Sequence, residues 1–229
     1  MPTRSAIFPQ DDSSEAENRV LPWFRHDMES PPAPRQAAVA ASVRLGTRYA
    51  VLAAVVLIQG CLGGIYAWST FVPALHGTWG LGMAQTQLLF GGLIGVFTLA
   101  MIPAGRLLRR VGPKPVAVFG GSLFAVGFLL AAASGGRFGI LFVGISLLAG
   151  TGTGCCYVCA LTSGAAWFPE RKGLVTGLAV AGFGGGAVVL AFLGQWLLTR
   201  GMDVLRVLGV VGAMYGVVIV CAAWLLSLP

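Results

Sequence analysis

The sequence predicts an all-α polytopic membrane protein with six transmembrane helices, and three observations carry this prediction. Of the 229 residues, 56% are hydrophobic and 10% are charged, whereas about a quarter of the residues are charged in an ordinary soluble domain. Six apolar stretches follow one another, each close to or above the roughly 20 residues that a helix needs to cross the hydrocarbon core. The 34 glycines supply the small residues on which helix packing in lipid depends. These features exclude a typical soluble enzyme.

The chain divides near residue 48. Residues 1–48 are rich in Pro, Ser, Ala and charge and have no apolar period, so we expect a disordered cytoplasmic tail. A secretory signal is not expected because the apolar run begins only after Arg48 and is too long; a presequence-like role is the alternative. Residues 49–229 form the predicted six-span domain. We expect its spans at 49–73, 85–104, 115–134, 138–167, 173–199 and 204–228.

The distribution of basic residues predicts the orientation in the membrane. If the N-terminus is inside, twelve of the 15 Lys and Arg residues lie on the cytoplasmic side, and Arg137, Arg200 and Arg206 lie opposite. Basic residues accumulate in cytoplasmic loops. We therefore expect a multi-pass protein of the inner (plasma) membrane with both termini in the cytoplasm, and no nucleic acid partner.

The break after the second span is strongly basic. It reads Gly105-Arg106-Leu107-Leu108-Arg109-Arg110-Val111-Gly112-Pro113-Lys114. We expect the two glycines to frame a tight turn and the bases to stand at the cytoplasmic surface. On spacing alone, a plain basic anchor explains this run equally well.

This run resembles the loop between the second and third spans of the major facilitator superfamily, whose pattern is G-x-L-x-D-R-x-G-[RP]-[RK]. The matching positions are Gly105, Leu107, Arg110, Gly112, Pro113 and Lys114, and Arg109 stands where the family has an aspartate. The resemblance implies a cytoplasmic gate formed by Gly105, Arg109, Arg110, Gly112 and Lys114.

A second motif narrows the resemblance. Trp167-Phe168-Pro169-Glu170-Arg171-Lys172-Gly173 joins the fourth and fifth spans, and the first span contains Ile65-Tyr66-Ala67-Trp68-Ser69. Together they resemble the oxalate/formate antiporter branch, which is related to monocarboxylate carriers. The likeness covers roughly 49–228 and implies the N-terminal half of a twelve-span fold, built as two inverted three-helix repeats. The pairs Gly150/Gly154 and Gly182/Gly186 predict close helix contacts.

Polar residues at helical spacing suggest a cavity. Gln59, Gly63, Tyr66 and Thr70 would share one face of the first span, and Thr153 and Tyr157 one face of the fourth. In the resembled family, Tyr66, Gln87 and Tyr157 fall near the central dicarboxylate cavity, and Trp68 is a weaker candidate. The alternative is that these groups only join helices by hydrogen bonds.

Other chemistry is not expected. The five cysteines all fall within spans and read as small apolar packing residues rather than a metal or redox site. No Asp, Glu, Lys, Arg or His lies centrally in any predicted span, so these helices offer no proton relay. It also lacks the cations that bind carboxylates in the resembled antiporters, which belong to the eighth and eleventh spans. We expect no catalytic residue, no metal and no cofactor.

The sequence thus favours a secondary transporter of small organic anions, mono- or dicarboxylates, that works by alternating access. Its partners would be the lipid bilayer, a small carboxylate substrate and a second six-helix half, supplied by a separate chain or by self-association. The alternative is a truncated or split non-transporting membrane module that acts in assembly or interaction. A channel or receptor of another six-helix class would not explain the run from Trp167 to Gly173.

Overall fold

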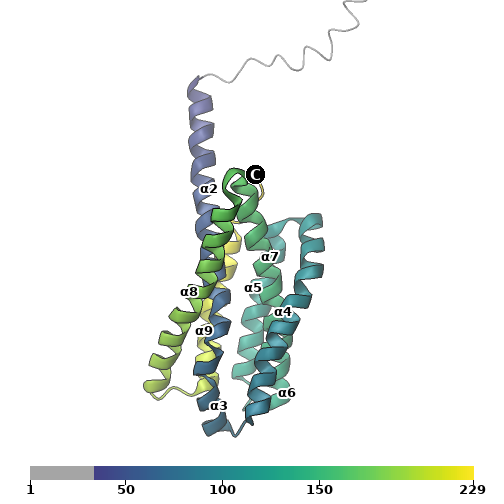
Figure 1. The fold of residues 1–229 in the computed structure, drawn as a ribbon, viewed down its shortest axis with the longest axis vertical. Helices are drawn as coiled ribbons and strands as arrows, with labels where there is room; N and C mark the ends of the chain where they lie inside the picture. Colours follow the sequence, from purple (N-terminus) through teal and green to yellow (C-terminus); the bar gives the residue numbers. More distant parts are fainter. Residues whose placement is uncertain (1–33) are drawn as a thin grey trace, which may run out of the picture. The chain divides into compact units, whose positions relative to one another are not determined.

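The computed structural model describes residues 34–229, with side chains from Gly46 onward. The chain divides into two compact units, 1–45 and 46–229, and the packing described below is that of the second unit. Residues 1–33 of the predicted tail lie outside the described residues. The first described helix begins at Pro34, so residues 34–48 of that tail belong to a helix (Figure 1).

The described elements are all helical. In chain order they are α2 (Pro34–Gly63), η2 (Gly64–Thr70), α3 (Val72–Trp79), α4 (Met83–Val111), α5 (Pro113–Ala132), α6 (Phe138–Leu141), η3 (Phe142–Ala149), α7 (Gly150–Trp167), η4 (Pro169–Arg171), α8 (Lys172–Thr199) and α9 (Val204–Ala223). Six segments are long and apolar enough to cross a membrane: Gly46–Thr70, Met83–Val111, Pro113–Ala132, Phe138–Trp167, Pro169–Thr199 and Val204–Ala223. The predicted fold class is confirmed.

The turn between the second and third spans is shorter than expected. Helix α4 continues through Gly105 to Val111, because leucine and arginine between them are good helix formers. The chain reverses at Gly112 alone, where φ is 86°, a value that glycine adopts at little cost. Pro113 then begins α5 with a φ suited to the first helical position. The prediction that two glycines frame this turn is wrong for Gly105.

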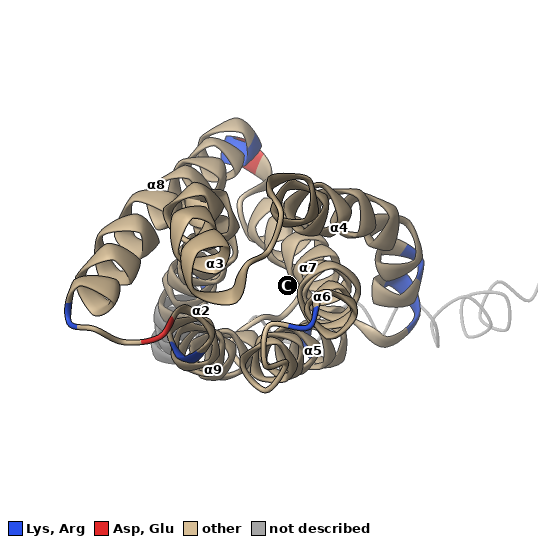
Figure 2. Ribbon diagram, turned by 90° about the horizontal axis from the view of Figure 1, so that it is seen from below, with Lys and Arg blue, Asp and Glu red and all other residues tan. Residues whose placement is uncertain are grey.

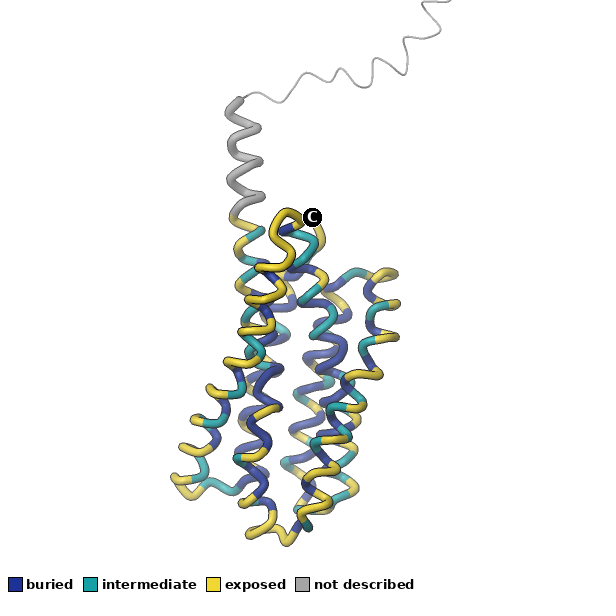
Figure 3. The backbone as a smooth tube through the Cα atoms, in the orientation of Figure 1, coloured by how far each residue is buried: buried dark blue, intermediate teal, exposed yellow. Residues whose placement is uncertain are grey.

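Glycines allow the backbones of neighbouring helices to approach closely. The buried residues lie on the helix faces that point towards the other helices (Figure 3). A Cβ on Gly154 would lie 2.7 Å from the carbonyl oxygen of Phe97, and one on Gly150 would lie 3.0 Å from that of Leu93. These contacts hold α7 against α4. The close approach predicted for Gly150/Gly154 is therefore confirmed.

Close contacts between glycines and backbone carbonyl oxygens also join α2 to α8. A Cβ on Gly186 would collide with the carbonyl oxygen of Gly60, and one on Gly63 would collide with that of Phe183. A Cβ on Gly182 would lie 3.3 Å from the carbonyl oxygen of Val56. The close approach predicted for Gly182/Gly186 is also confirmed.

The polar stripe expected on the first span is not continuous. The α-helix ends at Gly63 and η2 follows as a 3₁₀-helix, which has three residues per turn and so changes the face that later side chains occupy. Gln59 is fully buried, whereas Tyr66 is 52% exposed. Both amide atoms of Gln59 lack a hydrogen-bond partner among the described residues.

Replacing Gly186 with alanine should destabilise the bundle, because the new methyl group meets backbone that cannot move aside. We expect a loss of about 1–3 kcal/mol, the usual cost of overpacking, seen as a lower thermal midpoint of the detergent-solubilised protein. Gly185→Ala is the matched control, since nothing lies within 4 Å of a Cβ at Gly185. Equal midpoints for the two variants would contradict the packing described for α2 and α8.

Replacing Gln59 with leucine should leave stability unchanged or raise it. An unpaired buried amide costs free energy, and an apolar side chain of similar size removes that cost. Thermal unfolding of Gln59→Leu beside Gln59→Asn checks this expectation, because asparagine keeps the amide and leaves a gap. A clear loss of stability in the leucine variant alone would mean that the amide has a partner.

Candidate functional site

Five aromatic rings meet on one side of the bundle, and we call them the aromatic cluster: Tyr66 of η2, Phe90 and Phe97 of α4, Tyr157 of α7 and Phe183 of α8. The ring centroid of Phe183 lies 5.6 Å from that of Tyr66 and 5.5 Å from that of Tyr157. Phe90 lies 6.1 Å from Tyr66, and Phe97 lies 5.3 Å from Tyr157. All four contacts are edge-to-face, the arrangement that aromatic quadrupoles favour. The structure thus brings Tyr66 and Tyr157 together through Phe183.

The glycine contacts position these rings. The backbone of Phe183 is fixed against Gly63, three residues before Tyr66, so the two rings meet across the α2–α8 contact. The backbone of Phe97 is likewise fixed against Gly154, three residues before Tyr157. Each tyrosine therefore contacts a phenylalanine whose backbone a nearby glycine holds in place.

One side of the aromatic cluster is open. Tyr66 is exposed, and Phe90, Tyr157 and Phe183 are half-buried. Gln87 is exposed on α4 and lies three residues before Phe90, on the same helix face. The side chains of Tyr66, Gln87 and Tyr157 make no hydrogen bond or ion pair with any residue of 46–229. Two phenol hydroxyls and one amide are therefore free to donate to an oxygen-rich ligand.

Trp68 lies elsewhere. Its ring is buried, and its indole Nε1 donates a hydrogen bond of 3.0 Å to the carbonyl oxygen of Thr86. This bond ties η2 to the start of α4. Thr153 is also buried and donates to the carbonyl oxygen of Ala149 at 2.7 Å. Neither side chain joins the open side of the aromatic cluster.

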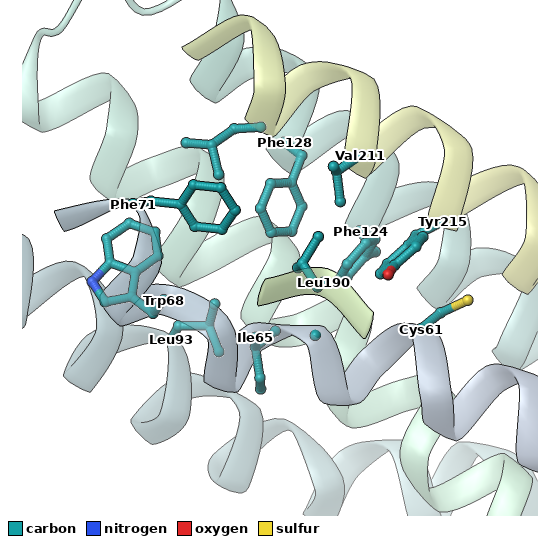
Figure 4. Close-up of a pocket in the computed structure, with 12 residues that line it drawn as sticks. Cys61, Ile65, Trp68, Phe71, Leu93, Phe124, Phe128, Leu190, Val211 and Tyr215 are labelled. Carbon is teal, nitrogen blue, oxygen red and sulfur yellow. The ribbon is translucent and has the colours of Figure 1, made fainter. Parts of the chain in front are cut away.

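Trp68 instead lines a small apolar cavity that reaches across the bundle to α9 (Figure 4). Phe71, Phe124, Phe128 and Tyr215 are among its other walls, and its volume is about 20 Å³. That volume holds about one water molecule. A carboxylate placed there would lose its hydration without a cation to replace it, so this cavity is not the candidate site.

The charged residues of the described part lie towards the helix ends and the periphery (Figure 2). Arg48 pairs with Glu170, and its guanidinium lies 4.0 Å from the centroid of the Phe168 ring. This is the one ion pair among residues 46–229. Lys114 lies with its Nζ 4.9 Å from the centroid of Trp224. Arg109 and Arg110 of the predicted gate are exposed near the end of α4.

Metal and disulfide chemistry find no support in the part of the chain that the structure describes. It contains no group of three or more His, Cys, Asp or Glu residues that could hold a metal ion. The five cysteines are unpaired, and three of them are buried. The thiol of Cys156 donates to the carbonyl oxygen of Ala117 at 3.3 Å, as a small packing residue does.

Three rings of the aromatic cluster were not predicted from the sequence: Phe90, Phe97 and Phe183. Phe183 carried a usable signal, because it is the single large residue in the run from Gly182 to Gly186. A bulky ring between helix-packing glycines is held rigidly beside the neighbouring helix. Phe90 and Phe97 lie seven residues apart, a spacing that core residues share.

Comparison with known proteins assigns the chain to a protein family. The family model of the Major Facilitator Superfamily matches residues 38–229. The chain is 33% identical over 158 residues to the uncharacterized MFS-type transporter YhjX of Escherichia coli (strain K12), an alignment that covers 69% of this chain and 39% of the relative.

Two further relatives carry functional names. The chain is 28% identical over 198 residues to the oxalate:formate antiporter of Oxalobacter formigenes, covering 81% of this chain and 44% of the relative. It is 34% identical over 120 residues to monocarboxylate transporter 13 of Rattus norvegicus, covering 52% of this chain and 25% of the relative. The chain spans less than half the length of these relatives.

The six-span bundle is consistent with half of the fold of this family, and its apolar helices fit a multi-pass membrane protein. The matched region includes every described span. The chain belongs to the Major Facilitator Superfamily, a family of membrane transporters.

Proposed function

We propose that this chain forms half of a secondary transporter that moves small organic anions, mono- or dicarboxylates, by alternating access. The observation that carries the proposal is the open aromatic cluster, where two tyrosines with free hydroxyls meet through Phe183. The names of the oxalate:formate antiporter and of monocarboxylate transporter 13 support the substrate class.

The residues in and beside the aromatic cluster have distinct roles in this proposal. The hydroxyls of Tyr66 and Tyr157 donate to carboxylate oxygens, and the amide of Gln87 adds a donor from α4. Edges of aromatic rings carry partial positive charge and also favour an anion. Trp68 acts indirectly, because its bond to Thr86 fixes the segment that carries Tyr66.

A second six-helix half, from a separate chain or a second copy, completes the site. The Lys and Arg residues of 46–229 lie towards the helix ends and the periphery (Figure 2), so in this proposal the second half supplies the cation for the carboxylate. Helices α4 and α8 support a partner on this side. Within an apolar 18-residue stretch of each of their spans, 22% of the residues are buried in the bundle, against 44–56% in the corresponding stretches of the other four spans.

The competing function is a membrane module for assembly that transports nothing. Arg109 stands where the family's loop has an aspartate, and this replacement removes the carboxylate from the predicted gate. Uptake by the reconstituted protein separates the two functions.

The tyrosine hydroxyls should be needed for uptake. In liposomes that contain the complex as purified from its membrane, Tyr66→Phe and Tyr157→Phe should each weaken apparent affinity for labelled oxalate, formate or lactate by about 10- to 100-fold. This range corresponds to the loss of a hydrogen bond to a charged group. Tyr49→Phe is the matched control, because Tyr49 lies against Phe168 near the start of the first span. Uptake that is unchanged in both cluster variants would contradict the site, and the absence of uptake by the unaltered complex would contradict transport.

Orientation can be tested with single cysteines. In a background with Cys221→Ser, Arg109→Cys and Lys172→Cys should react with a membrane-impermeant thiol reagent only after cells are opened. Arg137→Cys should react in intact cells, since the positive-inside rule places it outside. Labelling of Arg109→Cys and Lys172→Cys from opposite sides would contradict the proposed six-span topology with cytoplasmic termini.

A further inference from the structure

We propose that a groove between α4 and α5 binds an anionic phospholipid, with the phosphate on two arginines and an acyl chain along the apolar walls. The groove has a volume of about 430 Å³. It is lined by Ala100, Pro103, Ala104, Arg106, Leu107, Arg110, Phe119, Thr151 and Cys155. The site is distinct from the aromatic cluster and does not require that the chain transports anything.

The groove follows from how three helices pack. Helices α4 and α5 join at Gly112 and each packs along α7, so α7 forms the floor where they separate. Thr151 and Cys155 of α7 line this floor, and Phe119 of α5 stands 56% exposed at one wall. The hydroxyl of Thr151 already donates to the carbonyl oxygen of Leu147 at 2.7 Å. The interior of the groove is therefore mainly apolar and suits an apolar ligand.

The mouth of the groove is positively charged. Arg106 and Arg110 lie four residues apart on α4 and both line the groove, near the end of the span Met83–Val111. Both are exposed, and neither has a hydrogen bond or ion pair with any residue of 46–229. Lys114 is the next basic residue along the chain, and it is stacked on Trp224.

No acid of the described bundle is free to neutralise these arginines. Glu170 is paired with Arg48, and Asp203 accepts from the indole of Trp79 and the backbone amide of Leu205. The neutralising anion therefore comes from outside residues 46–229. Basic pockets between transmembrane helices bind the head groups of anionic lipids, and a lipid also supplies the chain that the apolar walls fit.

The basic mouth of the groove and the aromatic cluster lie on different faces of α4. With 100° per residue in an α-helix, Pro103, Arg106 and Arg110 lie about 160–220° around α4 from Phe90, whereas Ala100 and Ala104, which also line the groove, lie about 40–80° from it on the side of α7. A second half that covers the aromatic cluster would therefore leave the basic mouth open to lipid. A lipid site here survives even if the chain transports nothing, so failure of one proposal leaves the other standing.

Native mass spectrometry of delipidated protein titrated with phosphatidylglycerol or phosphatidylcholine tests the proposal. The unaltered chain should retain phosphatidylglycerol preferentially. The double variant Arg106→Gln/Arg110→Gln should lose about 10- to 30-fold in apparent affinity, since each base near the surface contributes about a factor of five. Arg109→Gln and Arg171→Gln are matched controls, because they remove exposed bases that do not line the groove. Equal losses in the controls would overturn the site in favour of general surface charge.

Two further arms separate a lipid from a free anion and keep the test independent of variant folding. Millimolar inorganic phosphate should not displace phosphatidylglycerol from the unaltered chain, and displacement would overturn the acyl-chain part of the proposal. Phosphatidylglycerol with a photoreactive group in its acyl chain should crosslink to the unaltered chain near Pro103, Leu107 and Phe119. Crosslinks spread evenly over all six spans would overturn the site.

Discussion

Close contact between the carbonyl oxygens of one helix and the glycines of the next is the constraint on which the bundle depends. In lipid, burying apolar side chains gives helices no advantage over remaining separate, so van der Waals contact between closely approaching backbones has to hold them together. Gly63 and Gly186 provide this contact between α2 and α8, and Gly150 and Gly154 provide it between α4 and α7. The same contacts fix Phe183 and Phe97, so the packing of the bundle and the arrangement of the aromatic cluster have one cause.

The sequence predicts the number and type of the membrane-spanning segments well, because such a helix is recognisable from its length and hydropathy. The differences arise where local chemistry competes with those signals. The run from Arg106 to Arg110 suggested a loop because three of its five residues are charged. A helix end at the membrane interface tolerates charge, and α4 continues to Val111. Gln59 and Tyr66 were expected to share a face, but the change from α to 3₁₀ geometry at Gly64 separates them. No sequence period reports such a change.

The candidate site was predicted in part. Tyr66 and Tyr157 stand out because phenols are conspicuous in apolar spans, and the structure brings them together. Trp68 stood beside Tyr66 in the sequence, yet its indole is used for a bond to the backbone of Thr86. Phe183 was missed although it is the single large residue in a glycine run, because that position indicates close packing and does not show which rings the phenylalanine contacts. The sequence identified polar groups, but only the packing shows which of them remain free.

The ion pair between Arg48 and Glu170 has a mechanical consequence. It fastens the start of the first span to the turn before the fifth, and the guanidinium also stacks on Phe168. Farther along the same two helices, Gly60 and Gly186 are in backbone contact. Together with the packing of α5 on α9 and of α4 on α7, these two contacts join the first three spans to the last three within one compact unit. The six helices would then move as a single rigid body, and any rocking has to take place against whatever adjoins them.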